Sequence, residues 1–63
     1  MDEFLTTNQV EAEFGIRAST LRYFRHIDAG PPSFRLGRRV VYRRSGIEGW
    51  IQAQEKASIR GGK

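Results

Sequence analysis

The stretch from Ala18 to Ile27, ASTLRYFRHI, limits what this chain can fold into more than any other part of the sequence. When it is wound at about 100° per residue, it separates into an apolar stripe and a polar stripe, the pattern of an amphipathic helix. The apolar stripe is formed by Leu21, Phe24 and Ile27, with Thr20 beside it. The opposite stripe is formed by Ser19, Arg22 and His26, with Tyr23 adjacent. A small domain must bury the first stripe, which leaves the second in solvent.

The polar stripe combines hydroxyl, guanidinium, phenol and imidazole groups, which suit contacts with base edges and phosphates. We interpret the stretch as a DNA recognition helix. Its candidate contact residues are Ser19, Thr20, Arg22, Tyr23, Arg25 and His26. Arg25 lies at the border between the stripes. The alternative is that arginines outside an amphipathic helix form an ordinary solvated face.

The charge distribution favours a polyanionic partner. Residues 1–16 carry four acids and no base, whereas residues 17–44 carry eight arginines against Asp28 alone, a net +7. Residues 45–63 are nearly balanced at +1. Guanidinium groups pair bidentately with phosphates and guanine edges, while lysine acts as a point charge. A merely soluble surface would mix the two signs.

The segment before the organising stretch predicts a supporting helix over Leu5–Gly15. Thr6 and Gln9 have the spacing of a capping box, Leu5 and Val10 that of a hydrophobic staple, and Gly15 ends the helix. Only Gly15, Ile16 and Arg17 then separate the two helices, which is typical of a helix-turn-helix. Arg17 occupies the N-cap without a short side-chain oxygen, so Ser19 or a phosphate is expected to satisfy the free amides.

A hairpin is predicted downstream, because Gly30, Pro31 and Pro32 end the second helix and favour extended chain. In the run from Phe34 to Arg44, a three-residue tip of Gly37, Arg38 and Arg39 would pair Leu36 with Val40 and Phe34 with Tyr42. One face of the hairpin would then be apolar. The arginines at the tip would reach a minor groove, where negative potential is concentrated. The alternative is a solvated tip that prevents edge aggregation.

A third helix is predicted to close the core. Ser45 would be its N-cap with Glu48 as capping-box partner, and Ile47, Trp50, Ile51 and Gln54 would share one face. The aromatic residues expected in the core are Phe14, Phe24, Phe34 and Trp50. Tyr23 and Tyr42 fit either the rim of the core or phosphate contact. Residues 4–55 thus form one predicted domain, and residues 56–63 a flexible basic tail.

Several classes of function lack their signatures. The chain has no cysteine and one histidine, so neither a disulfide framework nor a metal site is predicted. No glycine-rich phosphate loop or catalytic constellation is evident, so we expect no enzymatic activity, cofactor or small-molecule substrate. No apolar run approaches about 18 residues and the start, MDEF, is acidic, which predicts a cytoplasmic protein without membrane contact.

Four segments together carry a family resemblance: LTTNQVEAEFGI, STLRYFRH, FRLGRRVV and YRRSGIEGWI. They resemble the small MerR-like winged-helix family of phage and actinobacterial excisionases and AlpA-type regulators, over about Leu5 to Ile51. The resemblance implies an α+β winged helix-turn-helix with two N-terminal helices, a β-hairpin wing and a C-terminal helix. Arg17, Gly46 and Gly49 depart from the family pattern, which usually has a capping serine and better helix formers there.

The resemblance also implies site residues and partners. Major-groove contacts would fall on Ser19, Thr20, Arg22 and Tyr23, and wing contacts on Arg38 and Arg39. Beyond the resemblance, we expect Arg35 to join the wing contacts and Arg17, Arg43 and Arg44 to contact phosphates. The implied task is that of a recombination directionality factor, which binds repeated double-stranded DNA sites side by side, bends them and directs a tyrosine integrase. The alternatives are a transcriptional regulator of a phage or mobile element and, from another class, a basic protein-interaction or RNA-binding module.

Overall fold

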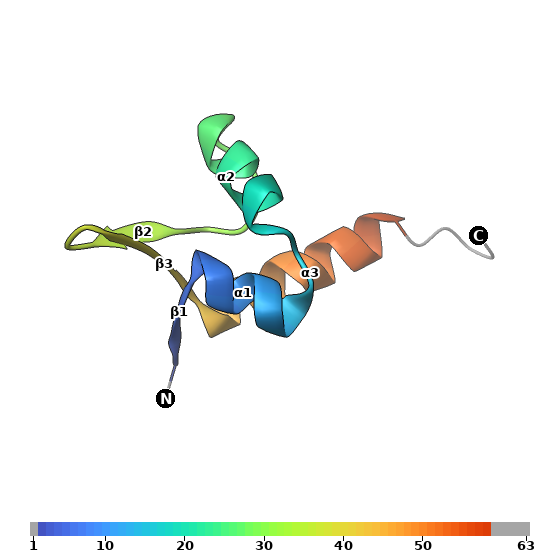
Figure 1. Cartoon of the computed structure of the whole chain (residues 1–63). Helices are drawn as coiled ribbons and strands as arrows, with labels where there is room; N and C mark the ends of the chain where they lie inside the picture. The colour runs from blue at the N-terminus through green and yellow to red at the C-terminus, as the bar shows by residue number, and fades with distance from the viewer. Residues whose placement is uncertain (1, 59–63) are drawn as a thin grey trace.

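The computed structural model describes residues 2–58, which form three helices and one three-stranded antiparallel sheet (Figure 1). The elements in chain order are β1 (Phe4–Thr6), α1 (Thr7–Phe14), α2 (Ala18–His26), β2 (Phe34–Leu36), β3 (Arg39–Arg43) and α3 (Arg44–Ser58). The predicted α+β class is therefore confirmed. In Figure 1 the β2–β3 hairpin and α2 project from a body formed by α1, α3 and the base of the sheet.

Helix α1 has the predicted termini. The Thr6 hydroxyl oxygen accepts a hydrogen bond from the Gln9 amide at 3.2 Å, and Gln9 Oε1 accepts one from the Thr6 amide at 2.8 Å. Gly15 ends the helix in the left-handed region, with φ 78°, and donates its N–H to the Glu11 carbonyl. Such capping satisfies amides and carbonyls that a helix end otherwise leaves without partners.

Helix α2 follows after three residues, and its two ends differ in capping. Arg17 precedes it without a side-chain capping bond, as predicted. At the other end, the Ala29 amide donates to the Phe24 carbonyl at 2.8 Å, and Asp28 takes a left-handed conformation with φ 59°. These are the features of a Schellman ending. Ile27 was predicted to pack, but it is 46% exposed because the helix ends there.

The sheet has the order β1–β3–β2, so β3 is its central strand. Strand β1 was not predicted. It pairs antiparallel with β3, which sets Leu5 opposite Tyr42 and Phe4 opposite Arg43. A strand of three residues that ends on the helix N-cap, Thr6, carries too little alternation to be recognised from the sequence.

The predicted register of the hairpin is wrong by one residue. Leu36 pairs with Arg39 and Phe34 with Val41, so only Gly37 and Arg38 lie between the strands. A one-residue shift moves side chains to the opposite face of a sheet. Phe34 and Leu36 are consequently 38% and 51% exposed, and Phe34 is not a core residue. A two-residue turn needs a positive φ, which Gly37 supplies at 67°.

The core is built from the inward side of β1 and β3 and from all three helices. Its buried cluster consists of Leu5, Val10, Leu21, Tyr42 and Ile47, and the partly buried residues around it are Phe14, Ile16, Val40 and Ile51. The rings of Phe24 and Trp50 contact each other at a centroid distance of 5.8 Å, and both are half-buried. Burial of Tyr42 assigns it to the core.

Helix α3 differs from the prediction at both ends. It begins at Arg44, and its first turn is held by Asp2, whose carboxylate accepts hydrogen bonds from the Ser45 amide at 3.1 Å and the Ser45 hydroxyl at 2.8 Å. The predicted Ser45–Glu48 capping box is therefore replaced by a cap from a distant segment. The helix continues to Ser58, so residues 56–58 are helical, and the rest of the predicted tail lies outside the described residues. Within residues 2–58, no helix combines the length and apolarity needed to cross a bilayer.

Among the glycines that the structure describes, Gly30 has the least space for a side chain. A Cβ atom placed there would lie 2.6 Å from Phe24 Cβ, and the residue has φ 80°. We expect Gly30→Ala to lower the free energy of unfolding by at least about 2 kcal/mol, because overpacking adds to left-handed strain. Gly15→Ala is the matched control: its φ is 78° but its Cβ would meet open space. It should cost about 1 kcal/mol. Equal losses in urea denaturation would contradict the steric explanation.

Candidate nucleic-acid interface

The exposed side of α2 carries four of the predicted recognition residues. Ser19, Arg22, Tyr23 and His26 are all exposed, and Tyr23 retains 58% of its surface. Thr20 lies beside them and is partly buried. Arg17 is exposed at the start of the same helix, where no side chain caps the first amides. The helical pattern thus placed this group correctly on one surface.

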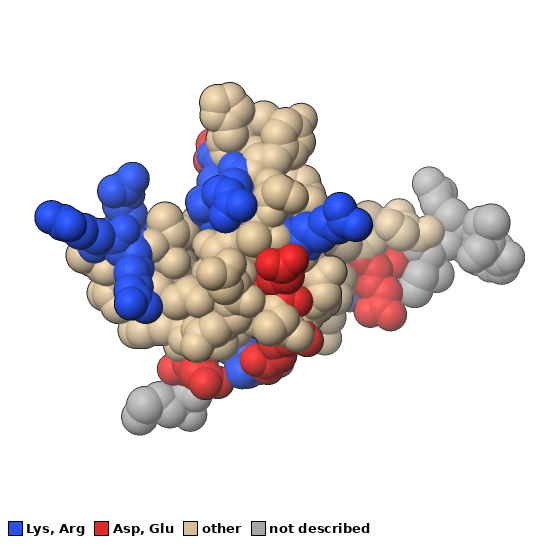
Figure 2. Space-filling model, in the orientation of Figure 1, with Lys and Arg blue, Asp and Glu red and all other residues tan. Residues whose placement is uncertain are grey.

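The β2–β3 hairpin carries a second basic group. Arg35, Arg38 and Arg39 are exposed around its turn. Figure 2 shows the Lys and Arg side chains reaching outward over this hairpin and over α2, whereas Asp and Glu side chains gather mainly along the lower edge. Among residues 2–58, no ion pair involves the arginines of the hairpin turn or Arg22. These cations therefore face solvent without neutralisation.

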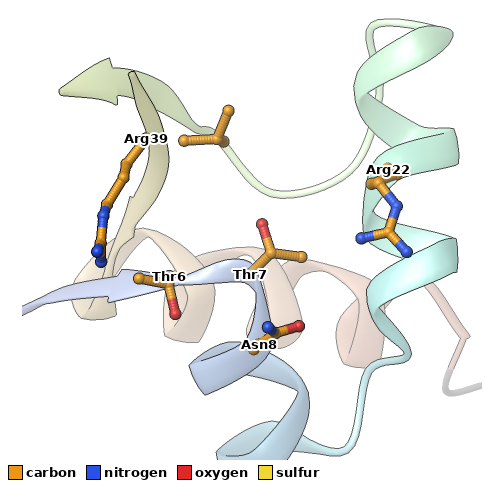
Figure 3. A pocket seen from close by; sticks show the side chains of 6 residues that line it. Thr6, Thr7, Asn8, Arg22 and Arg39 are labelled. Carbon is orange, nitrogen blue, oxygen red and sulfur yellow. The ribbon is translucent and has the colours of Figure 1, made fainter. Parts of the chain in front are cut away.

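A cleft of about 380 Å³ separates the two basic groups (Figure 3). Its lining comes from the start of α1, from α2 and from β3, and consists of Thr6, Thr7, Asn8, Arg22, Arg39 and Val40. Arg22 and Arg39 lie on opposite sides of the cleft, with Thr7 and Asn8 between them. No carboxylate belongs to this lining. No pattern in the sequence indicated Thr7 and Asn8, because only the packing of α1 against α2 brings them here.

Arg25 requires a correction. It was predicted to contact DNA, but its side chain is partly buried and hydrogen-bonded inside the protein. Its NH1 atom donates to the Tyr42 hydroxyl at 2.6 Å and to Thr7 Oγ1 at 3.2 Å. Its border position on the helix turns it toward α1 and β3, where it joins three elements. Arg25 is thus a positioning residue.

Arg44 also requires a correction, because carboxylates occupy its guanidinium. Its Nε and NH2 atoms donate to Glu3 Oε1 at 3.0 and 2.8 Å, and its NH1 atom donates to Glu13. The hydrogen bond to Arg44 lowers the pKa of Glu13, and the two carboxylates raise the pKa of Arg44. Arg44 therefore links β1, α1 and α3 and is not free for a phosphate.

Arg43 is diverted to the outer face of the sheet. Its guanidinium carbon lies 5.0 Å from the Phe4 ring centre and 5.7 Å from that of Phe34, and NH1 lies 3.6 Å from Asp2 Oδ2. Hydrogen bonds from Ser45, with a smaller contribution from the charge of Arg43, lower the pKa of Asp2. Arg43 therefore makes cation–π contacts and an ion pair while its side chain stays 54% exposed, and its phosphate contact remains a prediction.

Comparisons of the chain with protein-family models, with curated proteins and with solved structures find no match. The part of the chain that the structure describes contains no group of three His, Cys, Asp or Glu side chains arranged to hold a metal ion. Its most distinctive chemical feature is the pair of unneutralised arginine groups on either side of the cleft.

The Arg25–Tyr42 hydrogen bond allows a direct test of how α2 is held. Tyr42→Phe should lower the free energy of unfolding by about 1–3 kcal/mol, because a partly buried guanidinium loses an acceptor. Tyr23→Phe removes the same atom from an exposed side chain and should change stability by less than about 0.5 kcal/mol. Urea denaturation of both variants makes the comparison. Similar stability in the two variants would show that the bond does not hold α2.

Proposed function

We propose that this protein binds double-stranded DNA sequence-specifically as a winged helix-turn-helix. In this proposal α1 and α2 are the helix-turn-helix and the β2–β3 hairpin is the wing. The observation that carries it is the placement of two arginine groups, on α2 and on the hairpin turn, on either side of a cleft without carboxylates. Duplex DNA is the polyanion whose two grooves suit a helix and a thin ribbon.

The proposal assigns different grooves to the two basic elements. Helix α2 would enter the major groove with its exposed face, where Ser19, Tyr23 and His26 can reach base edges. The wing would place Arg35, Arg38 and Arg39 at the minor groove, whose negative potential attracts guanidinium groups. Arg17 would bind a phosphate at the uncapped start of α2.

Salt dependence tests duplex binding. The structure leaves Arg17, Arg22, Arg35, Arg38 and Arg39 for DNA, once the internally bonded arginines are set aside. Each neutralised phosphate adds about −0.9 to the slope of log K against log salt, so we expect roughly −4 to −5 by fluorescence anisotropy. Arg38→Ala should reduce the magnitude of this slope by about 0.9. Lys56→Ala removes the same charge from α3 and should leave the slope unchanged.

A slope near zero, or tighter binding to single-stranded RNA than to any duplex, would overturn the proposal. The second outcome would favour an RNA-binding module. Sequencing of duplexes selected from a random pool would supply the cognate site for the later measurements. Enrichment of no sequence, with binding intact, would remove sequence specificity alone.

We assign the biological role from the family resemblance: a recombination directionality factor that acts with a tyrosine integrase. A single domain of 63 residues covers little DNA, so it would have to occupy repeated sites and curve the duplex between them. Arginines in a compressed minor groove help to offset a bending energy of order 1–6 kcal/mol. A transcriptional regulator would need no such bend.

Bending separates these two roles. Arg38→Ala combined with Arg39→Ala should abolish the bend in circular-permutation gel mobility and the excision supported by the cognate integrase. Both residues are exposed, so the fold should remain. The matched control is Arg38→Lys with Arg39→Lys, which preserves charge and should retain part of the bend. A wild-type protein that binds a lone operator without bending it, and leaves excision unchanged, would identify a transcriptional regulator.

A further inference from the structure

The cleft between α2 and the β2–β3 hairpin lies where a particular part of DNA must pass. A major groove and the adjacent minor groove are separated by one sugar–phosphate backbone. A protein that inserts a helix into one groove and a hairpin into the other must straddle that backbone. The hollow between the two inserted elements is therefore the place for it, and in this protein that hollow is the cleft shown in Figure 3.

The size and lining of the cleft suit a polyanionic chain. Its volume of about 380 Å³ far exceeds the roughly 10–15 Å³ that one water molecule needs by the same measure, and it is largely open to solvent, so an extended segment can lie in it. Arg22 and Arg39 lie on opposite sides of it, and neither has an ion-pair partner among the described residues. Guanidinium groups form bidentate bonds with phosphate oxygens. No carboxylate in the lining opposes an anion.

The residues at the floor of the cleft, Thr7 and Asn8, can donate hydrogen bonds to an anion. Thr7 Oγ1 accepts a hydrogen bond from Arg25, which leaves the Thr7 hydroxyl proton free to be donated elsewhere. The Asn8 side chain adds an amide donor beside it. Arg25 itself is partly buried, and its bonds go to two hydroxyl oxygens and to no carboxylate within residues 2–58. Its positive charge therefore adds to that of the two arginines above.

We infer that this cleft binds the sugar–phosphate backbone of one DNA strand. Arg22 and Arg39 hold phosphates of that same strand from opposite sides, and Thr7 donates to a phosphate oxygen between them. The inference rests on the proposed function and narrows it. Arg22 and Arg39 become backbone contacts, so base reading by α2 falls to Ser19, Tyr23 and His26, and the minor groove is left to Arg35 and Arg38. The wing and α2 are coupled through one strand when DNA is bound.

The test combines two alanine variants with a duplex that lacks single phosphate charges. The probe is a 20-base-pair duplex from the random-pool selection, with one methylphosphonate at each position in turn. Neutralising a held phosphate should weaken wild-type binding roughly tenfold. Arg22→Ala and Arg39→Ala should each weaken binding by a similar factor. For each variant there should be one phosphate whose replacement by methylphosphonate no longer changes the affinity. The two phosphates should be the same or neighbouring positions of one strand.

Sequence dependence supplies the second readout. Arg22→Ala should weaken the selected duplex and a scrambled duplex by the same factor and reduce the magnitude of the salt slope by about 0.9. Arg38→Ala is the matched control, because Arg38 lies outside the cleft lining. DNA binding by Arg38→Ala should still weaken when a methylphosphonate replaces the phosphate to which Arg22→Ala has become insensitive. Circular dichroism and thermal melting of each variant confirm that the fold is kept.

Two results would overturn the inference while leaving the proposed function intact. One is a loss confined to the selected duplex in Arg22→Ala, which would make Arg22 a base reader. The other is that the phosphate whose neutralisation no longer affects Arg22→Ala and the phosphate whose neutralisation no longer affects Arg39→Ala lie on different strands. Failure of the proposed function looks different, since the wild-type protein would then enrich no duplex from the random pool or would bind single-stranded RNA more tightly than any duplex.

Discussion

The hydrogen bonds from Arg25 to Tyr42 and Thr7 fix the geometry on which the candidate interface depends. Helix α2 buries Ala18 and Leu21 and packs Phe24, half-buried, on Trp50, and the Arg25 hydrogen bonds add to this apolar contact. Hydrogen bonds are directional, and that from Arg25 ends on a fully buried tyrosine in the central strand. The hairpin continues from the same strand. One side chain on β3 therefore sets α2 and the hairpin relative to each other.

The fold as well as the sequence determines which arginines are paired with carboxylates and which are not. Strand β1 carries Asp2 and Glu3 to the start of α3, where they pair with Arg43 and Arg44. Glu13 of α1 completes this group on Arg44. Exposed ion pairs of this kind contribute little stability, but they remove two cations from the solvent-facing set. The arginines that remain unneutralised are those of α2 and the hairpin, which makes the basic surface narrower than the sequence alone indicated.

Features set by neighbours in the chain could be predicted, and features set by distant pairing could not. The capping of α1 depends on residues three apart, and it was correct. The end of α2 was correctly placed before the prolines, but Asp28 and not Gly30 is the left-handed residue that ends the helix. The exposed face of α2 followed from helical periodicity. The hairpin register, the β1–β3 pairing and the cap from Asp2 each depend on which distant residues meet. Arg25 is an example. Its position at the border of the polar stripe did not indicate that the hydroxyls of Thr7 and Tyr42 would lie within hydrogen-bond distance on the inner side of the helix.

The positive charge around the cleft links the fold to the proposed binding of DNA. Folding brings Arg22 and Arg39 to one cleft and places Arg25 under it, with no carboxylate among the lining residues. Like charges on one surface repel, and at physiological ionic strength this repulsion decays over a Debye length of roughly 8 Å. In the proposed complex, the hydrogen bonds of Arg25 would already hold α2 in place, so the backbone of α2 would need little ordering when a strand enters. The phosphates of that strand would then replace repulsion between the arginines with attraction, so a charge arrangement that is unfavourable in the free protein would favour a bound polyanion.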